Sequence, residues 1–242
     1  VLNYYTLKRN VAGTRSSSAG DFSGDTNSEI IWNYLISKGL SETCASAILG
    51  NFKIESNFDP GVQEIATGAG YGLAQWTGTR RDQLEEYARV MNKPVNDIEL
   101  QLQFLWLEID PAADHTYADL QWGCDRYGWT DKEGLYQRFI SMTDINEAAD
   151  FYCWAHERPY EPTANVEGRK SSAVEIYSFY SGSKGTSSSS KSDTKNSSNS
   201  SSSKNDTKSN SDTSSNKSTT AGKISTLDNF LFIGDSRYAG IE

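Results

Sequence analysis

The sequence predicts a mainly α (α+β) fold, in which a helical domain carries a small β element and is followed by a disordered linker. Apolar residues recur every three or four positions in several segments of residues 27–181, which is the spacing of one helix face. A glycine-rich stretch, 61–78, interrupts this pattern with a segment typical of a short strand or hairpin. Residues 182–224 are mostly Ser, Lys, Asn, Asp and Thr, a composition that cannot bury enough apolar surface to fold.

The 242-residue chain divides into an upstream connector (1–26), the helical domain (27–181), the linker (182–224) and a short last segment (225–242). A domain of roughly 150 residues suits one compact core. The chain begins at Val1 without an initiator Met and stops at Glu242 within a motif, so we interpret it as a fragment of a longer protein. It contains no run of 18 apolar residues, and we therefore expect no membrane insertion.

Charge is distributed unevenly along the chain. The linker carries seven Lys and three Asp, a net +4, whereas the whole chain is −9, so the remainder sums to −13. An acidic domain would repel the phosphate backbone that a nucleic-acid-binding protein must neutralise. We therefore expect no nucleic-acid partner, whereas a neutral or mixed-charge glycan is compatible with this charge.

Two helices are expected at the start of the domain. Thr26 begins the first, because Glu29 three positions later completes a capping box, and Gly39 favours the positive φ of a helix C-terminus. Ser41 is well placed to cap the second. The second helix carries an apolar stripe at four-residue spacing, formed by Cys44, Ile48 and Phe52.

Four further helices follow the glycine-rich stretch. Asn96 with Glu99 opens the second of them, and Asp144 with Glu147 opens the third. Prolines bound the first three, because they cannot continue a helix. The four apolar stripes are Leu84, Tyr87, Ala88 and Met91; Ile98, Leu102, Leu105 and Ile109; Ala148, Phe151 and Tyr152; and Ala173, Ile176, Tyr177 and Tyr180.

Glu55 stands out among the acidic residues because it continues an apolar stripe, three residues after Phe52 and close to the helix end that Pro60 predicts. Apolar walls disfavour the charged form of a carboxyl group and raise its pKa. A general acid for glycoside cleavage needs that property, because it must hold a proton near neutral pH. The alternative is a helix carboxylate that faces solvent or pairs with Lys53 or Arg80.

The cysteines and histidines do not predict a metal site. Cys44, Cys124 and Cys153 lack CxxC spacing, and the chain has two histidines. We expect no metal and no cofactor. A Cys124–Cys153 disulfide and three separate thiols both remain open.

Two motifs together resemble the phage tail lysozyme family and, more loosely, goose-type lysozymes and lytic transglycosylases. They are Asn51–Pro60 (NFKIESNFDP), which contains a Glu-Ser pair, and Gly70–Trp76 (GYGLAQW), which contains a Gly-Leu-x-Gln segment. The resemblance runs from about Asn27 to Ser181, including the region from Phe151 to Pro159 and Arg169. It implies a lysozyme-like helical domain in which a catalytic helix end faces a strand that lines the cleft.

The same resemblance implies roles for individual residues. Glu55 would be the catalytic acid, Ser56 would support it, and Tyr71 and Gln75 would contact the sugar or its N-acetyl group. The residue chemistry agrees, because glycines let a bulky glycan approach the backbone and the Gln75 amide offers a donor and an acceptor. Trp76 is expected either to stack on a pyranose ring or to lie in the core.

A second carboxylate is less clearly indicated. Glycosidases usually use two, and Asp59 and Glu64 are the nearest in sequence. Each also has a simpler interpretation, Asp59 as a turn or cap residue and Glu64 as a surface charge. Goose-like relatives often use a single Glu, which positions water or lets a hydroxyl of the sugar attack. The second route makes the enzyme a lytic transglycosylase that leaves an anhydro end.

The last segment contains an apolar run followed by Gly234-Asp235-Ser236, which resembles the first block of SGNH/GDSL esterases. The resemblance makes Ser236 the nucleophile. The partner residues of such a site are absent before Glu242, so we expect Ser236 to be inactive in this chain.

The sequence therefore predicts a peptidoglycan glycosidase, a muramidase that cleaves the β-1,4 bond between N-acetylmuramic acid and N-acetylglucosamine. The expected partner is the glycan strand, and the expected location is extracellular, at the cell wall or in a phage tail. The alternatives are a lytic transglycosylase and a catalytically dead glycan-binding module. A buried ionisable Glu55 argues against the dead module, because such a group is costly to keep in a site that only binds.

Overall fold

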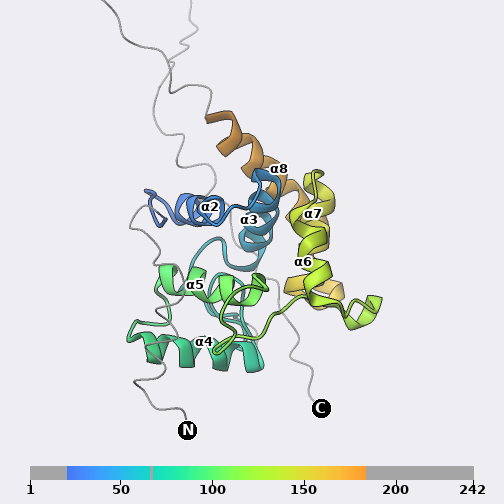
Figure 1. Ribbon diagram of the computed structural model, residues 1–242. Coiled ribbons are helices and arrows are strands. Elements are labelled where there is room, and N and C mark those ends of the chain that lie inside the picture. The colour runs from blue at the N-terminus through green and yellow to red at the C-terminus, as the bar shows by residue number, and fades with distance from the viewer. Residues whose placement is uncertain (1–20, 66–67, 184–242) are drawn as a thin grey trace, which may run out of the picture.

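The computed structural model describes residues 21–65 and 68–183, which form a mainly helical domain, as predicted (Figure 1). An upper tier contains α2, α3, α7 and α8, and a lower tier contains α4 and α5. The helices are α2 (Asn27–Ser37), α3 (Glu42–Ser56), α4 (Gly78–Met91), α5 (Ile98–Ile109), α6 (Lys132–Ile140), α7 (Ile145–Tyr152) and α8 (Val166–Ser183), with the short helices η1 (Asp125–Tyr127), η2 (Cys153–Glu157) and η3 (Glu161–Thr163).

The expected helix starts are local features, and most of them are confirmed. The Thr26 side chain accepts a hydrogen bond from the Glu29 amide, and Ser41 and Asp144 cap α3 and α7 in the same way. Glu29 closes its box one residue earlier than expected, since its carboxylate accepts from the Asp25 amide. For α5 the expectation of Asn96 is wrong by one position, because Asp97 makes the cap.

Besides the three-residue turns η1 and η3, two helical elements were not expected from the sequence. The 3.6-residue pattern of α6 is short, and only Leu135 and Phe139 are buried, so a nine-residue helix escaped the search for apolar stripes. The other is η2, a turn of π-helix that continues α7. It ends at Glu157, and the amide of the next residue, Arg158, donates to the Cys153 carbonyl at 2.7 Å. Single turns of π-helix occur often at functional sites.

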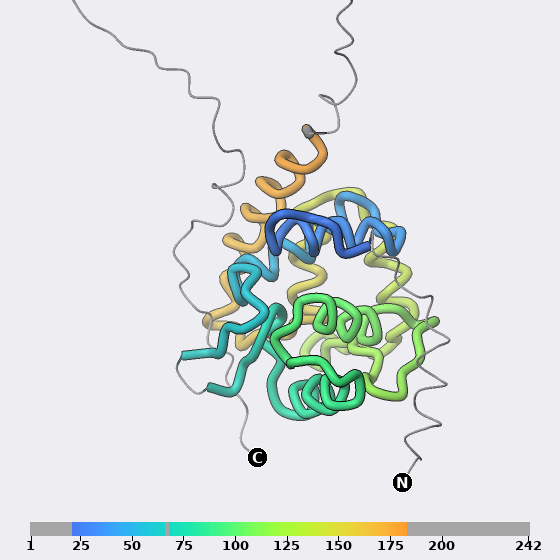
Figure 2. Tube along the Cα trace, turned by 90° about the vertical axis from the view of Figure 1, so that its left-hand side faces the viewer, coloured from blue at the N-terminus to red at the C-terminus, as the bar shows by residue number. Residues whose placement is uncertain are grey.

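The expected β element is present only as isolated bridges. Within the described residues, the pairs Gln63–Tyr71 and Tyr71–Trp76 bridge, and no longer strand forms in the glycine-rich stretch. This stretch projects to the left of the molecule as the teal segment in Figure 2. It leaves the end of α3 and returns to α4.

Helix α3 forms the centre of the upper tier, packed against α2, α7 and α8 (Figure 1). A Cβ atom at Gly50 would lie 2.6 Å from the Arg169 carbonyl oxygen and 2.7 Å from the Ala173 Cβ. Gly50 therefore lets α8 cross α3 at a distance that a side chain would prevent.

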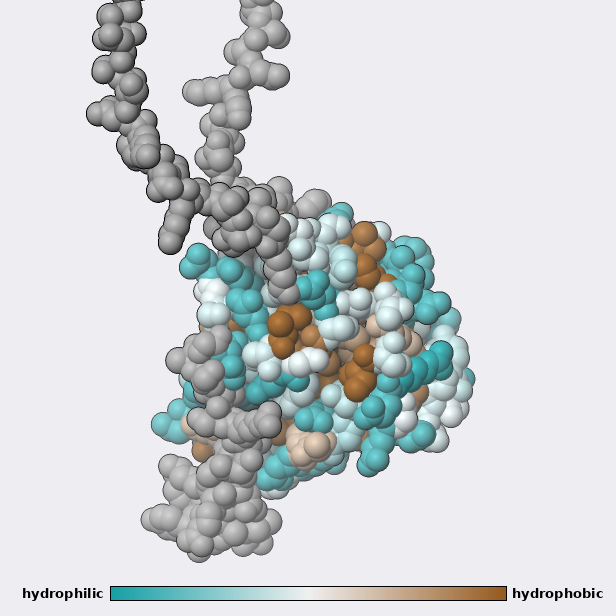
Figure 3. Space-filling view, turned by 45° about the horizontal axis from the view of Figure 1, so that its top comes forward, coloured by the Kyte–Doolittle hydropathy of each residue, from teal (hydrophilic) through white to brown (hydrophobic). Residues whose placement is uncertain are grey.

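The outer face is largely hydrophilic where it is seen from the top of the molecule, with hydrophobic side chains in small separate areas (Figure 3). Among the described residues, no helix combines the length and the apolar character needed to cross a bilayer. Most of the connector and of the linker lies outside the described residues, which include only 21–26 of the first and 182–183 of the second. Ser236 and the rest of the last segment also lie outside them.

Candidate active site

Glu55 lies in the last turn of α3 and has 0% of its surface exposed. The other members of its stripe, Cys44, Ile48 and Phe52, are equally buried, so the periodicity identified the buried face correctly. The helix ends one residue later at Ser56, where Asn57 adopts a left-handed conformation with φ of 50°.

The nearest charged partner of Glu55 comes from α8. Arg169 Nη2 donates to Glu55 Oε1 at 3.0 Å, and Arg169 has 0% of its surface exposed. Its other nitrogens bind elsewhere, because Nη1 donates to Asn51 Oδ1 at 3.1 Å and Nε donates to the Ala164 carbonyl at 2.6 Å. One guanidinium thus joins α3 to α8 and to the loop before α8.

Asn51 extends this network to a third helix. Its Nδ2 donates to the Ala47 carbonyl at 2.8 Å within α3 and to the Ala149 carbonyl of α7 at 3.1 Å. Asn51 is buried, and its oxygen and its nitrogen are both engaged. The position of Glu55 is therefore set by α3, α7 and α8 together.

This environment differs from the apolar pocket that the sequence suggested. A guanidinium at 3.0 Å favours the charged form of Glu55, whereas burial disfavours it, so the two influences oppose each other. The alternative of a carboxylate that faces solvent is wrong, because Glu55 is completely buried. Lys53 donates to Asn57 Oδ1 at 2.5 Å, and Arg80 pairs with Glu108.

Ser56 connects the end of α3 to the glycine-rich loop. Its hydroxyl donates to the Leu73 carbonyl at 2.9 Å. The loop is closed by two backbone hydrogen bonds between Tyr71 and Trp76, of 3.1 and 2.9 Å. The structure therefore brings the two sequence motifs together, through a backbone carbonyl and the residue that follows Glu55.

Gln75 holds this loop in shape. It has φ of 47°, is buried, and donates from Nε2 to the carbonyls of Gly72 at 2.9 Å and Val62 at 3.3 Å. A Cβ at Gly70 would lie 2.7 Å from Gln75 Oε1, so this glycine is needed for packing inside the loop. The Gln75 amide thus serves the loop itself.

Tyr71 is half-buried on the outer side of the loop, with the Arg81 guanidinium 5.2 Å from the centre of its ring. Burial raises the pKa of the Tyr71 phenol, Arg81 opposes that shift, and Asp59 and Glu85 add to it.

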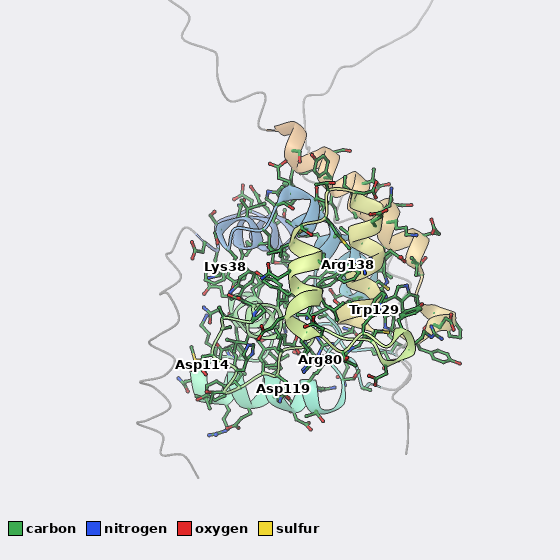
Figure 4. All side chains as sticks on the ribbon, turned by 45° about the vertical axis from the view of Figure 1, so that its right-hand side comes forward. Lys38, Arg80, Asp114, Asp119, Trp129 and Arg138 are labelled. Atoms are coloured by element: carbon green, nitrogen blue, oxygen red, sulfur yellow. The ribbon has the colours of Figure 1, made fainter. Side chains whose placement is uncertain are left out.

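Trp76 lies in the core, which corrects the expectation that it stacks on a sugar. It has 0% of its surface exposed, its Nε1 donates to Glu108 Oε2 at 2.8 Å, and its ring meets Phe104 edge-on. Glu108 also binds Arg80, a residue of the first turn of α4 that is labelled in Figure 4. Neither Glu108 nor Arg80 was expected to form this buried pair.

The two candidates for a second carboxylate occupy different settings. Asp59 is exposed, and its Oδ1 accepts from the Gly61 amide at 2.7 Å, as in a turn. Glu64 is buried, so its interpretation as a surface charge is wrong, and its Oε2 accepts from the Gly70 amide at 3.4 Å.

Sequence reasoning assigned no role to Arg169, although its position carried a signal. It precedes Ala173 by four residues and Ile176 by seven, and so continues the apolar stripe of α8. A cation on a buried helix face needs a buried anion, because an unpaired charge there is strongly unfavourable. That rule predicts a partner for Arg169 but does not identify Glu55.

All three cysteines are buried free thiols. Burial raises the pKa of the Cys153 thiol to about 12; Arg169 opposes this shift, and Glu55, Glu157 and Asp150 add to it. Over residues 21–65 and 68–183, no group of His, Cys, Asp and Glu is arranged to hold a metal ion.

A helical domain with a buried glutamate at a helix end, joined to a glycine-rich loop, defines the lysozyme-like class. The phage tail lysozyme family model matches residues 26–180, and the chain belongs to that family. The chain is also similar to Morphogenesis protein 1 of Bacillus phage B103, with 25% identity over 148 residues. That match covers 59% of this chain and 36% of the phage protein, so the chain spans about a third of its relative.

Proposed function

We propose that this domain cleaves the glycan strands of peptidoglycan, as a muramidase that cuts between N-acetylmuramic acid and N-acetylglucosamine with Glu55 as general acid. Membership in the phage tail lysozyme family supports the lytic activity. The observation that carries the proposal is the position of Glu55, buried at the end of α3 and next to the residue that binds the Leu73 carbonyl. The setting of action is the bacterial cell wall, reached from a phage particle.

In this mechanism, Glu55 donates its proton to the glycosidic oxygen as the bond to C1 of N-acetylmuramic acid breaks. The oxygen leaves as the free hydroxyl of N-acetylglucosamine. A water molecule then bonds to C1 and returns a proton to the Glu55 carboxylate. If the C6 hydroxyl of the muramic sugar attacks in place of water, the product has an anhydro end.

The proposal requires substrate binding to open a path to Glu55. No part of its side chain is exposed. Hydrogen bonds of catalytic groups in unliganded enzymes often reach their working geometry only with substrate bound. The loop that contains Tyr71 and Gln75 is the element that contacts the end of α3 through Ser56.

The test is Glu55→Gln in the full 242-residue chain, assayed on purified peptidoglycan sacculi. The amide keeps the shape but has no transferable proton, so the rate of release of soluble fragments should fall by about 10²–10⁴-fold. Glu86→Gln is the matched control, because Glu86 is exposed and pairs with Arg89 at the surface. A Glu55→Gln protein that lyses sacculi at the wild-type rate rejects the proposal. Mass spectrometry of the products separates hydrolysis, which leaves a reducing end, from transglycosylation.

One observation favours a second candidate, a glycan-binding module without turnover. The pair between Glu55 and Arg169 gives Glu55 a structural use as a buried counter-ion. In that case the wild-type chain would sediment with sacculi and release no soluble fragments over hours. Glu55→Gln would then change the stability of the protein and leave its sedimentation with sacculi unchanged.

A further inference from the structure

Of the two aromatic residues in the glycine-rich motif Gly70–Trp76, Tyr71 alone is partly exposed. Trp76 is completely buried in the core, whereas Tyr71 is half-buried on the outer side of the loop. A tyrosine ring offers a large apolar face and its hydroxyl a polar edge, so it suits a ligand that also combines apolar and polar surfaces. A pyranose ring is such a ligand, because C–H groups cover its faces and hydroxyls point outward from its rim. Tyr71 is therefore the aromatic side chain of this motif that a sugar can reach.

Arg81, near the start of α4, contacts both the backbone of this loop and the ring of Tyr71. Its Nη1 donates to the Gly68 carbonyl at 2.8 Å and to the Ala69 carbonyl at 3.2 Å. Its Cζ lies 5.2 Å from the centre of the Tyr71 ring, within the range of a cation–π interaction. One guanidinium thus holds the ring and the nearby loop backbone in a fixed relation to each other.

The start of α4 is itself anchored to the rest of the domain. Arg80, the preceding residue, binds Glu108 of α5 through two hydrogen bonds of 2.7 and 2.8 Å. Arg81 Nε donates to Glu85 Oε1 at 2.9 Å, one helical turn further along α4, and this bond orients the guanidinium plane. Arg81 therefore positions the ring of Tyr71 relative to the body of the domain as well as to the loop.

The contacts of Arg81 are not what closes the loop. Backbone hydrogen bonds already close it, from the Glu64 amide to the Gly70 carbonyl at 2.8 Å and from the Gly72 amide to the Val62 carbonyl at 2.9 Å. Since the backbone of the loop is held in this way, the distinct contribution of Arg81 is the position of the tyrosine side chain.

A second arginine of α4 shows how an ordinary surface position differs. The Arg89 side chain is 69% exposed, and its Nε and Nη2 donate to Glu86. Exposed pairs of this kind contribute little to stability. The Arg81 side chain is only 25% exposed, and two of its partners are backbone carbonyls of the glycine-rich loop. Arg89 therefore offers a control with the same charge on the same helix.

We propose that Arg81 is a positioning residue that holds the Tyr71 ring in the orientation in which it stacks on a sugar ring of the glycan strand. The inference rests on the proposed function, since it takes the glycan as the ligand. A side chain that is ordered before binding avoids the loss of rotamer freedom that a mobile side chain incurs when the ligand binds. Arg81 acts through Tyr71 and does not itself touch the glycan, so its removal should weaken binding and leave the chemical step unchanged.

The first test compares Arg81→Gln with Arg89→Gln in the full 242-residue chain, by initial rates of lysis of purified sacculi. Arg81→Gln should raise the apparent KM about three- to tenfold, because the substrate must then order the Tyr71 ring, and should leave kcat within about twofold. Arg89→Gln should match the wild type in both constants. An unchanged KM in Arg81→Gln overturns the inference, and so does a fall in kcat alone.

A double-mutant cycle shows whether Arg81 acts through Tyr71. Affinity for sacculi is measured by sedimentation, with Glu55→Gln in every protein so that the sacculi are not consumed. Arg81→Gln should weaken binding about three- to tenfold when Tyr71 is present, and should have no further effect once Tyr71→Leu has removed the ring. Equal effects in the two backgrounds contradict a role through the ring. Arg81→Lys, which keeps the charge but not the planar fork, takes the place of Arg81→Gln if that variant does not fold.

The contact itself can be checked without any glycan. Burial raises the pKa of the Tyr71 phenol, and the positive charge of Arg81 opposes that shift. Arg81→Gln should therefore raise the Tyr71 pKa further, as followed by carbon-13 NMR of labelled tyrosine, with the signal assigned by its loss in Tyr71→Leu. An unchanged pKa overturns the inference.

Failure of the proposed function can be told apart from failure of this inference. Wild-type protein that binds sacculi without lysing them rejects the proposed catalysis, whereas the binding cycle still decides the role of Arg81. Wild-type protein that does not bind sacculi at all rejects both.

Discussion

Among the described residues, two Arg–Glu pairs contain a completely buried carboxylate, Arg169–Glu55 in the upper tier and Arg80–Glu108 in the lower tier, and they are built differently. Glu108 accepts from Arg80 Nε at 2.7 Å on one oxygen, and from Arg80 Nη2 and Trp76 Nε1, both at 2.8 Å, on the other. Arg169 reaches Glu55 through Nη2 and uses Nη1 and Nε on Asn51 and the Ala164 carbonyl.

The difference shows why burial alone does not identify a catalytic carboxylate. Arg80 gives a fork of two donors to one carboxylate and Trp76 adds a third, so three hydrogen bonds hold the side chain of Glu108 in one position. Arg169, on α8, distributes its donors over α3 and the loop before α8, and so contacts Asn51 and the Ala164 carbonyl as well as Glu55. The Arg80–Glu108 pair connects α4 to α5, and the Arg169–Glu55 pair lies at the candidate active site.

The largest expected effect comes from removing each arginine. Arg169→Met should lower the free energy of unfolding by about 3–5 kcal/mol, because it leaves a buried carboxylate without its cation. Arg80→Met should cost less, since the Arg80 side chain is 12% exposed and water can reach the place it vacates. Urea unfolding at pH 7, followed by circular dichroism, measures both. If Arg80→Met lowers the free energy of unfolding more than Arg169→Met does, then the Arg169–Glu55 pair contributes less to stability than the Arg80–Glu108 pair.

A smaller effect separates the two carboxylates by function. Glu108→Gln places an amide group against the donors of Arg80 and Trp76, and the loss of these charge-assisted hydrogen bonds should cost about 2–3 kcal/mol. The folded Glu108→Gln protein should still lyse sacculi within a few-fold of the wild type, unlike Glu55→Gln. Lysis rates at a temperature where both variants are folded make the comparison. Equal inactivity of the two folded variants would remove the distinction between them.

The smallest expected effect is on the pH dependence of stability. It comes from the thiol of Cys153, whose pKa is influenced by burial, by Arg169 and by Glu55. Its pKa rises from an ordinary value of 9.0 to about 12 in the folded protein. The folded state therefore favours the neutral thiol, so this contribution to stability is complete below about pH 9 and disappears as the pH rises toward 12. At pH 10 the loss should be about 1.4 kcal/mol.

Unfolding free energies from pH 8 to pH 10.5 test this expectation. Cys153→Ala should flatten the alkaline decline, whereas Cys124→Ala leaves Cys153 in place and should retain it. An unchanged decline in Cys153→Ala would assign the effect to other groups, such as Tyr87, whose pKa burial raises to about 12.

Several features of the fold were predictable because they depend on neighbours in sequence. The caps at Thr26, Ser41 and Asp144 require a side chain and an amide three residues apart. The stripe that ends at Glu55 follows from helix periodicity. The start of α5 was misplaced by one residue, because Asn96 and Asp97 are both good caps.

The contents of the site were less predictable. Arg169 is 114 positions from Glu55 in sequence, and Glu108 is 32 from Trp76. Periodicity shows that such residues are buried but not what they meet. Both carboxylates nearest in sequence to Glu55 were considered as its companion, whereas the charged side chain that binds it, Arg169, comes from the far end of the domain.

By itself, the sequence determined where α2, α3 and α7 begin, which faces of the expected helices are apolar, and that a glutamate continues one of those faces. These properties depend on residues within one or two turns of each other. Only the tertiary structure decided that the neighbour of Glu55 is a cation, that Trp76 belongs to the core, and that Gln75 serves the loop. The physical reason is the close crossing of α3 and α8 at Gly50, which brings charges that are remote in sequence into one place that water does not reach.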